Sequence, residues 1–141
     1  MEPIAIKRIN HVGVVAANLE ASVAWYVRHL GFERLYDYSF PGVTAAFIRK
    51  GELRLEFFQS DGASPMADER RDIATNVKIG GINHFALEVD DIEATFAALA
   101  ANGVEVVQPP AEIPDSGGEK FGFIKDLEGM LIEFFQPCQS S

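Results

Sequence analysis

The amino-acid sequence predicts an α+β fold that is built from two copies of one βαβββ module. Two repeats and a shared order of predicted elements between them support this fold class. The repeats are the triplet INH at residues 9–11 and 82–84, and the strings LRLEFFQ and MLIEFFQ at residues 53–59 and 130–136.

Each repeat carries one histidine and one glutamate at matching positions. His11 corresponds to His84 at an offset of 73 residues, and Glu56 corresponds to Glu133 at an offset of 77 residues. The two copies therefore stay in register within four residues. A duplicated scaffold that places two imidazoles and two carboxylates at equivalent points predicts one four-ligand metal site on a pseudo-two-fold axis.

The first module begins with a strand and a helix. Residues 6–16 alternate and are rich in β-branched side chains, which predicts a strand. Asn18 offers a helix cap, and Gly31 ends an apolar stripe with helical spacing. Three more strands are predicted at residues 32–39, 43–50 and 53–59, with turns at 41–42 and 50–52.

The second module repeats this order. Residues 82–89 predict a strand, and Asp90 followed by Glu93 has the spacing of a capping box. A helix follows and ends at Asn102 and Gly103. The last three strands are predicted near residues 104–108, 119–125 and 129–135, with a turn at 126–129 between the last two.

The chain of 141 residues has the length of one domain, and we expect residues 1–141 to form a single one. Module 1 spans about residues 6–60 and module 2 about residues 81–137. The polar segment 61–80 predicts a linker with one helical turn. Each module alone has an open sheet edge, which favours joining of two modules edge to edge, within one chain or between two.

Composition excludes several classes of function. A net charge of −9 and a pI of about 4.7 argue against binding to nucleic acid or to an anionic membrane surface. The single cysteine, Cys138, allows no intrachain disulfide. The sequence shows no signal peptide and no apolar run of membrane-spanning length, so we expect a cytoplasmic protein.

Side-chain parity predicts where the four repeated residues point. Successive residues in a strand face opposite sides, so His11, Glu56, His84 and Glu133 all lie opposite the apolar set of their own strand. The apolar sets are expected to pack on the helices. The histidines and glutamates then face away from the helices.

A metal site has to be weighed against simpler interpretations. A lone histidine on an apolar strand is more often a core residue than a ligand, whereas a glutamate between Leu and Phe needs a partner or a metal. Two matched His and Glu pairs make coincidence a weak explanation, although a duplication can also preserve ligands that bind nothing. The donor set suits one divalent ion per site: Ni, Co, Zn, Mn or Fe.

These modules resemble the vicinal oxygen chelate superfamily, which includes glyoxalase I, bleomycin resistance proteins and extradiol dioxygenases. The resemblance covers about residues 7–137 and is carried by HVGVVAANLEASVAWYVRHLGFE, GINHFALEVDDIEATFAALAANGVEV and FGFIKDLEGMLIEFFQ. It implies eight strands that form a cupped, half-open mixed sheet with the helices outside. It also implies a homodimer, with modules that pair within a chain or swap between chains.

The set His11, Glu56, His84 and Glu133 is most similar to the metal ligands of glyoxalase I (lactoylglutathione lyase). That resemblance implies a small-molecule substrate, glutathione hemithioacetal or another carbonyl or thioester compound. It implies proton transfer next to a metal-bound carbonyl through an enediolate. Glu133 is the first choice for the catalytic base and Glu56 the second.

Two positions depart from the glutathione-binding pattern of many bacterial glyoxalases I. Val15 stands where they have an arginine, and Ser60 stands where they often have an asparagine. Arg54 and Lys120 are the candidates to replace these groups, although a solvated surface charge is the more common role.

Three other functions remain open. LEFFQSDGASPMA and GGINHF resemble segments of methylmalonyl-CoA epimerases, with Asn83 in place of a histidine. An extradiol-type dioxygenase would use two His and one Glu, and Glu56 would then fill a substrate position. The third alternative is a metal-binding or small-ligand-binding module without turnover. Residues 60–80 and 110–119 are predicted to form the pocket walls. Trp25 and Tyr26 are predicted to be core or dimer contacts rather than catalytic groups.

Overall fold

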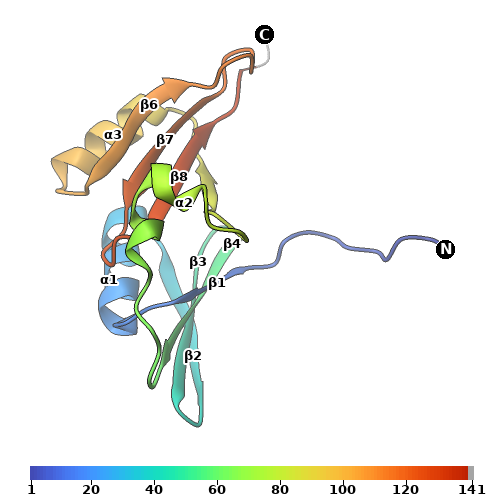
Figure 1. The fold of residues 1–141 in the computed structure, drawn as a ribbon, viewed down its shortest axis with the longest axis vertical. Helices are drawn as coiled ribbons and strands as arrows, with labels where there is room; N and C mark the ends of the chain where they lie inside the picture. The colour runs from blue at the N-terminus through green and yellow to red at the C-terminus, as the bar shows by residue number, and fades with distance from the viewer. Residues whose placement is uncertain (140–141) are drawn as a thin grey trace. The chain divides into compact units, whose positions relative to one another are not determined.

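The computed structural model describes residues 1–139 and divides into two units, residues 1–63 and residues from 64 onward. Each unit contains one βαβββ module with a four-stranded mixed sheet, which confirms the predicted α+β class (Figure 1). The predicted single domain and its module boundaries stay predictions.

In the first unit the sheet order is β1-β4-β3-β2. Strand β1 runs parallel to β4, and the other neighbours are antiparallel. Residues 1–11 lead to β1 as an exposed extended segment without a strand partner (Figure 1). The elements are β1 (Val12–Val15), α1 (Leu19–Leu30), β2 (Glu33–Phe40), β3 (Val43–Lys50) and β4 (Leu53–Ser60).

The second unit repeats the order as β5-β8-β7-β6, again with a parallel pair between the first and last strands of the module. Two short helices precede it, so the predicted linker folds with the second unit and has two helical turns rather than one. The elements are η1 (Asp68–Arg71), α2 (Ile73–Asn76), β5 (Ala86–Glu88), α3 (Ile92–Ala101), β6 (Val106–Glu112), β7 (Lys120–Lys125) and β8 (Leu131–Gln136).

One aromatic contact between helix and sheet lies at the core of each unit. Tyr26 of α1 meets Phe57 of β4 with ring centroids 5.0 Å apart, and both side chains are fully buried. Phe96 of α3 meets Phe134 of β8 at 5.8 Å. Gly122 of β7 permits this approach, because a Cβ there would lie 2.5 Å from the Phe96 ring. The helices therefore cover the apolar face of each sheet, as parity predicts.

Each EFFQ string ends in a glutamine whose side chain binds the first residue of the helix in its own module. Gln59 accepts a hydrogen bond from the backbone N–H of Leu19, and Gln136 accepts one from that of Ile92, both at 2.9 Å. Asn18 caps α1 as predicted, but Asp91 rather than Asp90 caps α3 by accepting from Ala94. Asp91 therefore supplies the helix cap that was predicted at Asp90.

Both first strands are shorter than predicted. β1 covers residues 12–15 of the predicted 6–16, and β5 covers residues 86–88 of the predicted 82–89. The alternating pattern was present, but the residues before each strand have no ladder partner on either side. No helix within residues 1–139 has the length and apolarity needed to span a bilayer.

Truncation of Phe57 should show how much the core of the first unit contributes to stability. Phe57→Ala removes a fully buried ring, so the free energy of unfolding should fall by about 3–5 kcal/mol. Phe40→Ala is the matched control, since Phe40 is 50% exposed, and it should cost less than about 1 kcal/mol. Urea denaturation of the two variants measures both values, and equal losses would contradict this placement of the core.

Candidate functional site

The strand pairing of the first unit brings His11 and Glu56 together. Gly13 of β1 lies opposite Glu56 of β4, and His11 precedes Gly13 by two residues on the same side of the chain. His11 Nε2 lies 3.3 Å from Glu56 Oε1. The glutamate side chain is 13% exposed and the histidine 35%, so the pair lies at the edge of a solvent-accessible face.

The second unit builds the same pair. Ala86 of β5 lies opposite Glu133 of β8, and His84 Nε2 lies 3.3 Å from Glu133 Oε2. The exposed fractions, 29% for His84 and 15% for Glu133, also match those of the first unit. The sequence repeat is therefore a repeat of geometry.

An asparagine orients each histidine. The Nδ1 atoms of His11 and His84 lie 2.8 and 2.6 Å from the amide oxygens of Asn10 and Asn83. An amide oxygen only accepts, so it favours the tautomer in which Nδ1 carries the proton. Nε2, the atom that faces the glutamate, then keeps its lone pair available for a metal.

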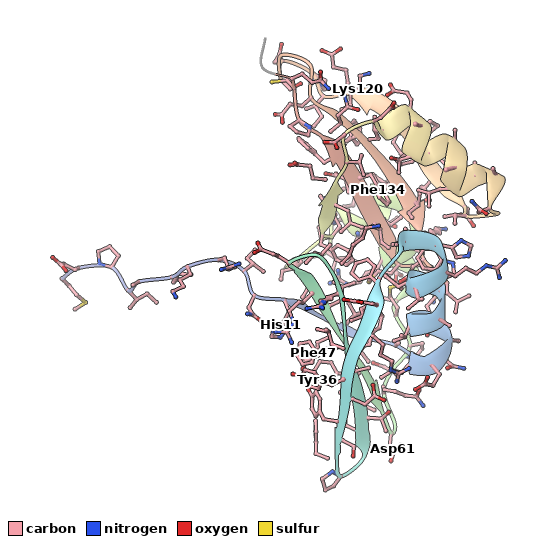
Figure 2. The ribbon with its side chains drawn as sticks, turned by 180° about the vertical axis from the view of Figure 1, so that it is seen from behind. His11, Tyr36, Phe47, Asp61, Lys120 and Phe134 are labelled. Atoms are coloured by element: carbon pink, nitrogen blue, oxygen red, sulfur yellow. The ribbon has the colours of Figure 1, made fainter. Side chains whose placement is uncertain are left out.

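A phenylalanine from the strand next to the glutamate contacts each histidine. His11 meets Phe47 of β3 edge to face at 5.1 Å, and His84 meets Phe123 of β7 in the same way at 5.1 Å. Phe47 is the cross-strand partner of Glu56, and Phe123 is that of Glu133. Figure 2 shows His11 and Phe47 close together on the side of the sheet away from α1.

Tyr38 makes the two pairs unequal. Its hydroxyl donates a 2.5 Å hydrogen bond to Glu56 Oε2, and this bond raises the pKa of Tyr38 to about 12. Tyr38 lies opposite Ala45 on β3, whereas Ala111 occupies the corresponding position of the second unit, opposite Phe121. Glu56 is therefore held by a tyrosine hydroxyl, whereas the second unit has an alanine at the matching position.

Burial raises the pKa of Glu133 above its usual value, and the neighbouring His84 opposes that shift. Burial disfavours the charged form of a carboxyl group, and here it outweighs the attraction of the imidazole. A cation at this position would favour the ionised form of the glutamate.

Each unit thus joins one predicted histidine to one predicted glutamate. Over residues 1–139, neither unit contains a group of three or more His, Cys, Asp or Glu side chains that could hold a metal ion. Each unit therefore supplies two donors, and the four-ligand assignment stays a prediction. The donors themselves fit a borderline divalent ion, because each pair offers an imidazole nitrogen and a carboxylate oxygen on one side.

The other candidate residues are now placed. Arg54 lies with its guanidinium carbon 4.4 Å from the centre of the Phe47 ring. Lys120 forms a 2.8 Å ion pair with Glu93 in the second unit. Val15 is 62% exposed, and Tyr26 packs in the core as predicted. Trp25 contacts the rings of Tyr26 and His29.

Sequence reasoning identified the His and Glu pairs but missed their supporting groups. Asn10 and Asn83 were visible as the middle letter of the repeated INH triplet, which was a usable signal. Phe47, Phe123 and Tyr38 gave no such signal, because their roles depend on cross-strand register. Residues 110–112 belong to β6, so only the remainder of the predicted wall 110–119 is a loop.

Comparison with known proteins agrees with this fold and these repeats. The family model of the Glyoxalase/Bleomycin resistance protein/Dioxygenase superfamily matches residues 8–134. An ethylmalonyl-CoA/methylmalonyl-CoA epimerase of Cereibacter sphaeroides is 32% identical, with 93% of this chain and 98% of the relative covered. A probable lactoylglutathione lyase of Vibrio cholerae is 28% identical, with 94% and 93% covered.

A solved structure extends the comparison to three dimensions. The glyoxalase family protein of Enterococcus faecalis superimposes with a TM-score of 0.74 at 29% identity, and the match covers 92% of this chain and 97% of that protein. The likeness therefore spans both modules.

The raised pKa of Glu133 should make its charge costly in the metal-free protein. Protonated Glu133 stabilises the folded protein relative to the unfolded chain at a pH below the ordinary glutamate pKa. This contribution is lost as the pH rises through the higher folded-state pKa. Glu133→Gln removes that loss, so the metal-free variant should be more stable than wild type near neutral pH and lose this advantage in acid. Urea denaturation with a chelator measures the difference.

Glu88→Gln is the control for this prediction. Glu88 is exposed on β5 of the same unit, so its replacement should leave stability nearly unchanged across the same pH range. A metal-free Glu133→Gln variant that is less stable than wild type at neutral pH would contradict the prediction.

Proposed function

The chain belongs to the Glyoxalase/Bleomycin resistance protein/Dioxygenase superfamily, and we propose that it is a metal-dependent enzyme that moves a proton at the carbon next to a carbonyl group. The observation that carries this proposal is the Asn, His and Glu arrangement that the chain builds twice. Both copies hold the His and Glu 3.3 Å apart and aim the same ring nitrogen at the carboxylate. Relatives named as epimerases and lyases support an enzyme.

The proposed metal ligands are His11, Glu56, His84 and Glu133. Each unit supplies one pair, so a four-ligand site takes the pairs of two modules, from one chain or from two chains of a homodimer. One divalent ion of the Ni, Co, Zn, Mn or Fe type suits two imidazoles and two carboxylates. When bound, the ion would stabilise the negative charge that develops on the substrate during proton removal.

Glu133 is the proposed base, and Glu56 is proposed to act mainly as a ligand. The Tyr38 hydroxyl donates to Glu56 Oε2, so this hydrogen bond already engages one oxygen of that carboxylate. Glu133 has no tyrosine at the matching position and is partly desolvated, which makes its carboxylate the better proton acceptor. The difference between the two units therefore supports Glu133 as the base and Glu56 as a metal ligand, although the two residues occupy equivalent positions.

An acyl-CoA thioester is the proposed substrate, with epimerisation next to the thioester carbonyl. The name of the 32% identical relative supports this class. Val15 and Ser60 also fit it, because neither offers the charged or amide group that the glutathione pattern places there. Glutathione hemithioacetal is the second candidate, favoured by the probable lactoylglutathione lyase at 28% identity and by the two-glutamate set.

Isotope exchange tests the proposed reaction. The protein loaded with Ni, Co, Mn, Zn or Fe should carry solvent deuterium into methylmalonyl-CoA, and the chelated protein should not. Glu133→Gln should lower the exchange rate by about 10²–10⁴-fold, because it removes the group that accepts the proton. Tyr38→Phe should retain exchange within about tenfold, since it removes only a hydrogen bond to the second glutamate.

The same experiment separates the alternatives. Mass spectrometry measures the label, and elemental analysis should find about one divalent ion per four-ligand site. Label in lactoylglutathione but not in the thioester would favour the lyase. Full exchange by Glu133→Gln would overturn the assigned base, and metal-stabilised melting without label in either substrate would favour a binding module.

The asparagines should control metal affinity without touching the ion. Asn83→Ala removes the acceptor of His84 Nδ1, so the affinity for a divalent ion should fall by about 10–100-fold. Asn83→Asp is the control, because it keeps an acceptor oxygen at that place and should bind metal at least as well as wild type. Competition with a chromogenic chelator measures both, and equal weakening in the two variants would contradict an orienting role.

A further inference from the structure

The first unit contains a basic cleft that the His and Glu pair does not account for. Its volume is about 750 Å³, within the range of small-molecule sites. We propose that it binds the phosphate groups of an acyl-CoA substrate, an inference that rests on the proposed function. The lining includes the cations Lys7, Arg8, Arg49 and Arg54, a single acidic residue, Glu52, and the ring of Tyr36.

Two of the arginines face each other. Arg49 of β3 and Arg54 of β4 are direct cross-strand partners on one face of the sheet. Like charges in this position repel and destabilise the strand pair unless a counter-charge lies between them. Glu33 meets Arg49 at 2.5 Å, but its side chain is 63% exposed, so solvent screens the pair. A bound anion would remove the remaining repulsion.

Arg54 also has hydrogen-bonding capacity that the protein leaves unused. Its Nε is buried and makes no hydrogen bond within residues 1–139. Its guanidinium lies over the Phe47 ring, which fixes the orientation of the fork. A guanidinium held in one orientation suits a phosphate group, because two of the phosphate oxygens can accept parallel hydrogen bonds from it.

The remaining cations are available to a ligand. The structure shows no partner for Lys7 among residues 1–139. Arg8 meets Glu52 at 3.5 Å, with the two side chains 63% and 90% exposed, so this ion pair is weak. Four cations and one carboxylate make a locally positive cleft on a chain whose net charge is −9. The two carboxylates of glutathione are partly balanced by its ammonium group, whereas coenzyme A carries several phosphates and a larger negative charge, so a positive cleft favours coenzyme A.

Comparison of the two repeats shows that the cleft belongs to one module. Lys7 and Arg8 precede the first INH triplet, and Gly80 and Gly81 stand at the same places before the second. Arg54 corresponds to Leu131, two residues before the glutamate in each copy. The catalytic repeat was therefore kept in both modules while three cations are present in the first only. A pseudo-symmetric metal site would in this way receive an asymmetric substrate in one orientation.

Phe47 connects the cleft to the His and Glu pair. Its ring contacts His11 at a centroid distance of 5.1 Å and also contacts the guanidinium of Arg54. Figure 2 shows His11, Phe47 and Tyr36 next to one another on this face of the sheet. A thioester beside His11 and Glu56 can therefore extend its phosphate-bearing end toward the arginines.

Calorimetric titration of the full chain without added metal tests the cleft separately from turnover. Coenzyme A should bind at least about tenfold more tightly than pantetheine, which lacks the phosphates, and this advantage should shrink as salt rises. The double variant Lys7→Gly with Arg8→Gly gives the first module the two glycines that the second module has at these positions. This double variant should lose about tenfold in affinity for coenzyme A and none for pantetheine.

A charge-matched control variant completes the test. Arg28→Gln with Lys78→Gln removes two positive charges outside the cleft and should bind coenzyme A as wild type does. Arg54→Leu, again the residue of the second module, should weaken coenzyme A binding without lowering the melting temperature, because it also removes the repulsion with Arg49. Equal affinity of wild type for coenzyme A and pantetheine, or equal losses in the cleft and control variants, would overturn the proposal. Missing deuterium exchange alone would refute the proposed reaction and leave this binding result standing.

Discussion

The parallel pairing between the first and last strands of each module determines how each histidine lies against its glutamate. It sets Gly13 opposite Glu56 and Ala86 opposite Glu133, with each histidine two residues earlier on the same face. A register slip of one residue would turn the histidine toward the helix. Such a slip is opposed by the core, because it would expose the strand residues that pack under the helix, Phe57 and Phe134 among them. The hydrophobic core therefore determines, through the strand register, that each histidine lies beside its glutamate.

The two modules share this frame and differ in what surrounds it. Both keep the asparagine, histidine, phenylalanine and glutamate in matching contacts, which indicates that the contacts work as a set. The first unit adds Tyr38 beside its glutamate and Arg54 two residues before it, whereas the second has Ala111 and Leu131. The repeat thus supplies equivalent donors, and the differences between the two units give them different environments.

The sequence allowed the repeated order of elements, the helix ends at Asn18 and Gly31 and the facing of His11 and Glu56 to be predicted, because these depend on local periodicity and on duplication. Strand length was less predictable, since β1 and β5 pair with only part of β4 and β8. Tyr38 could not be predicted, because its contact with Glu56 requires the register of β2, β3 and β4 together. The basic cleft likewise depends on the register of β3 and β4, together with Lys7 and Arg8 from the segment before β1.

Strand β4 departs from local stability rules at two alternate residues on one face. Arg54 lies opposite Arg49, and its own Nε is a buried donor without a hydrogen bond within residues 1–139. Glu56 places a carboxylate in a mostly buried position. Alternate residues of a strand lie about 7 Å apart, so an uncompensated positive group and a negative group follow each other along one surface. Local departures of this kind cluster where a ligand completes the structure. Their opposite signs match what an acyl-CoA site would require here, with a cation beside the glutamate and an anion beside the arginines.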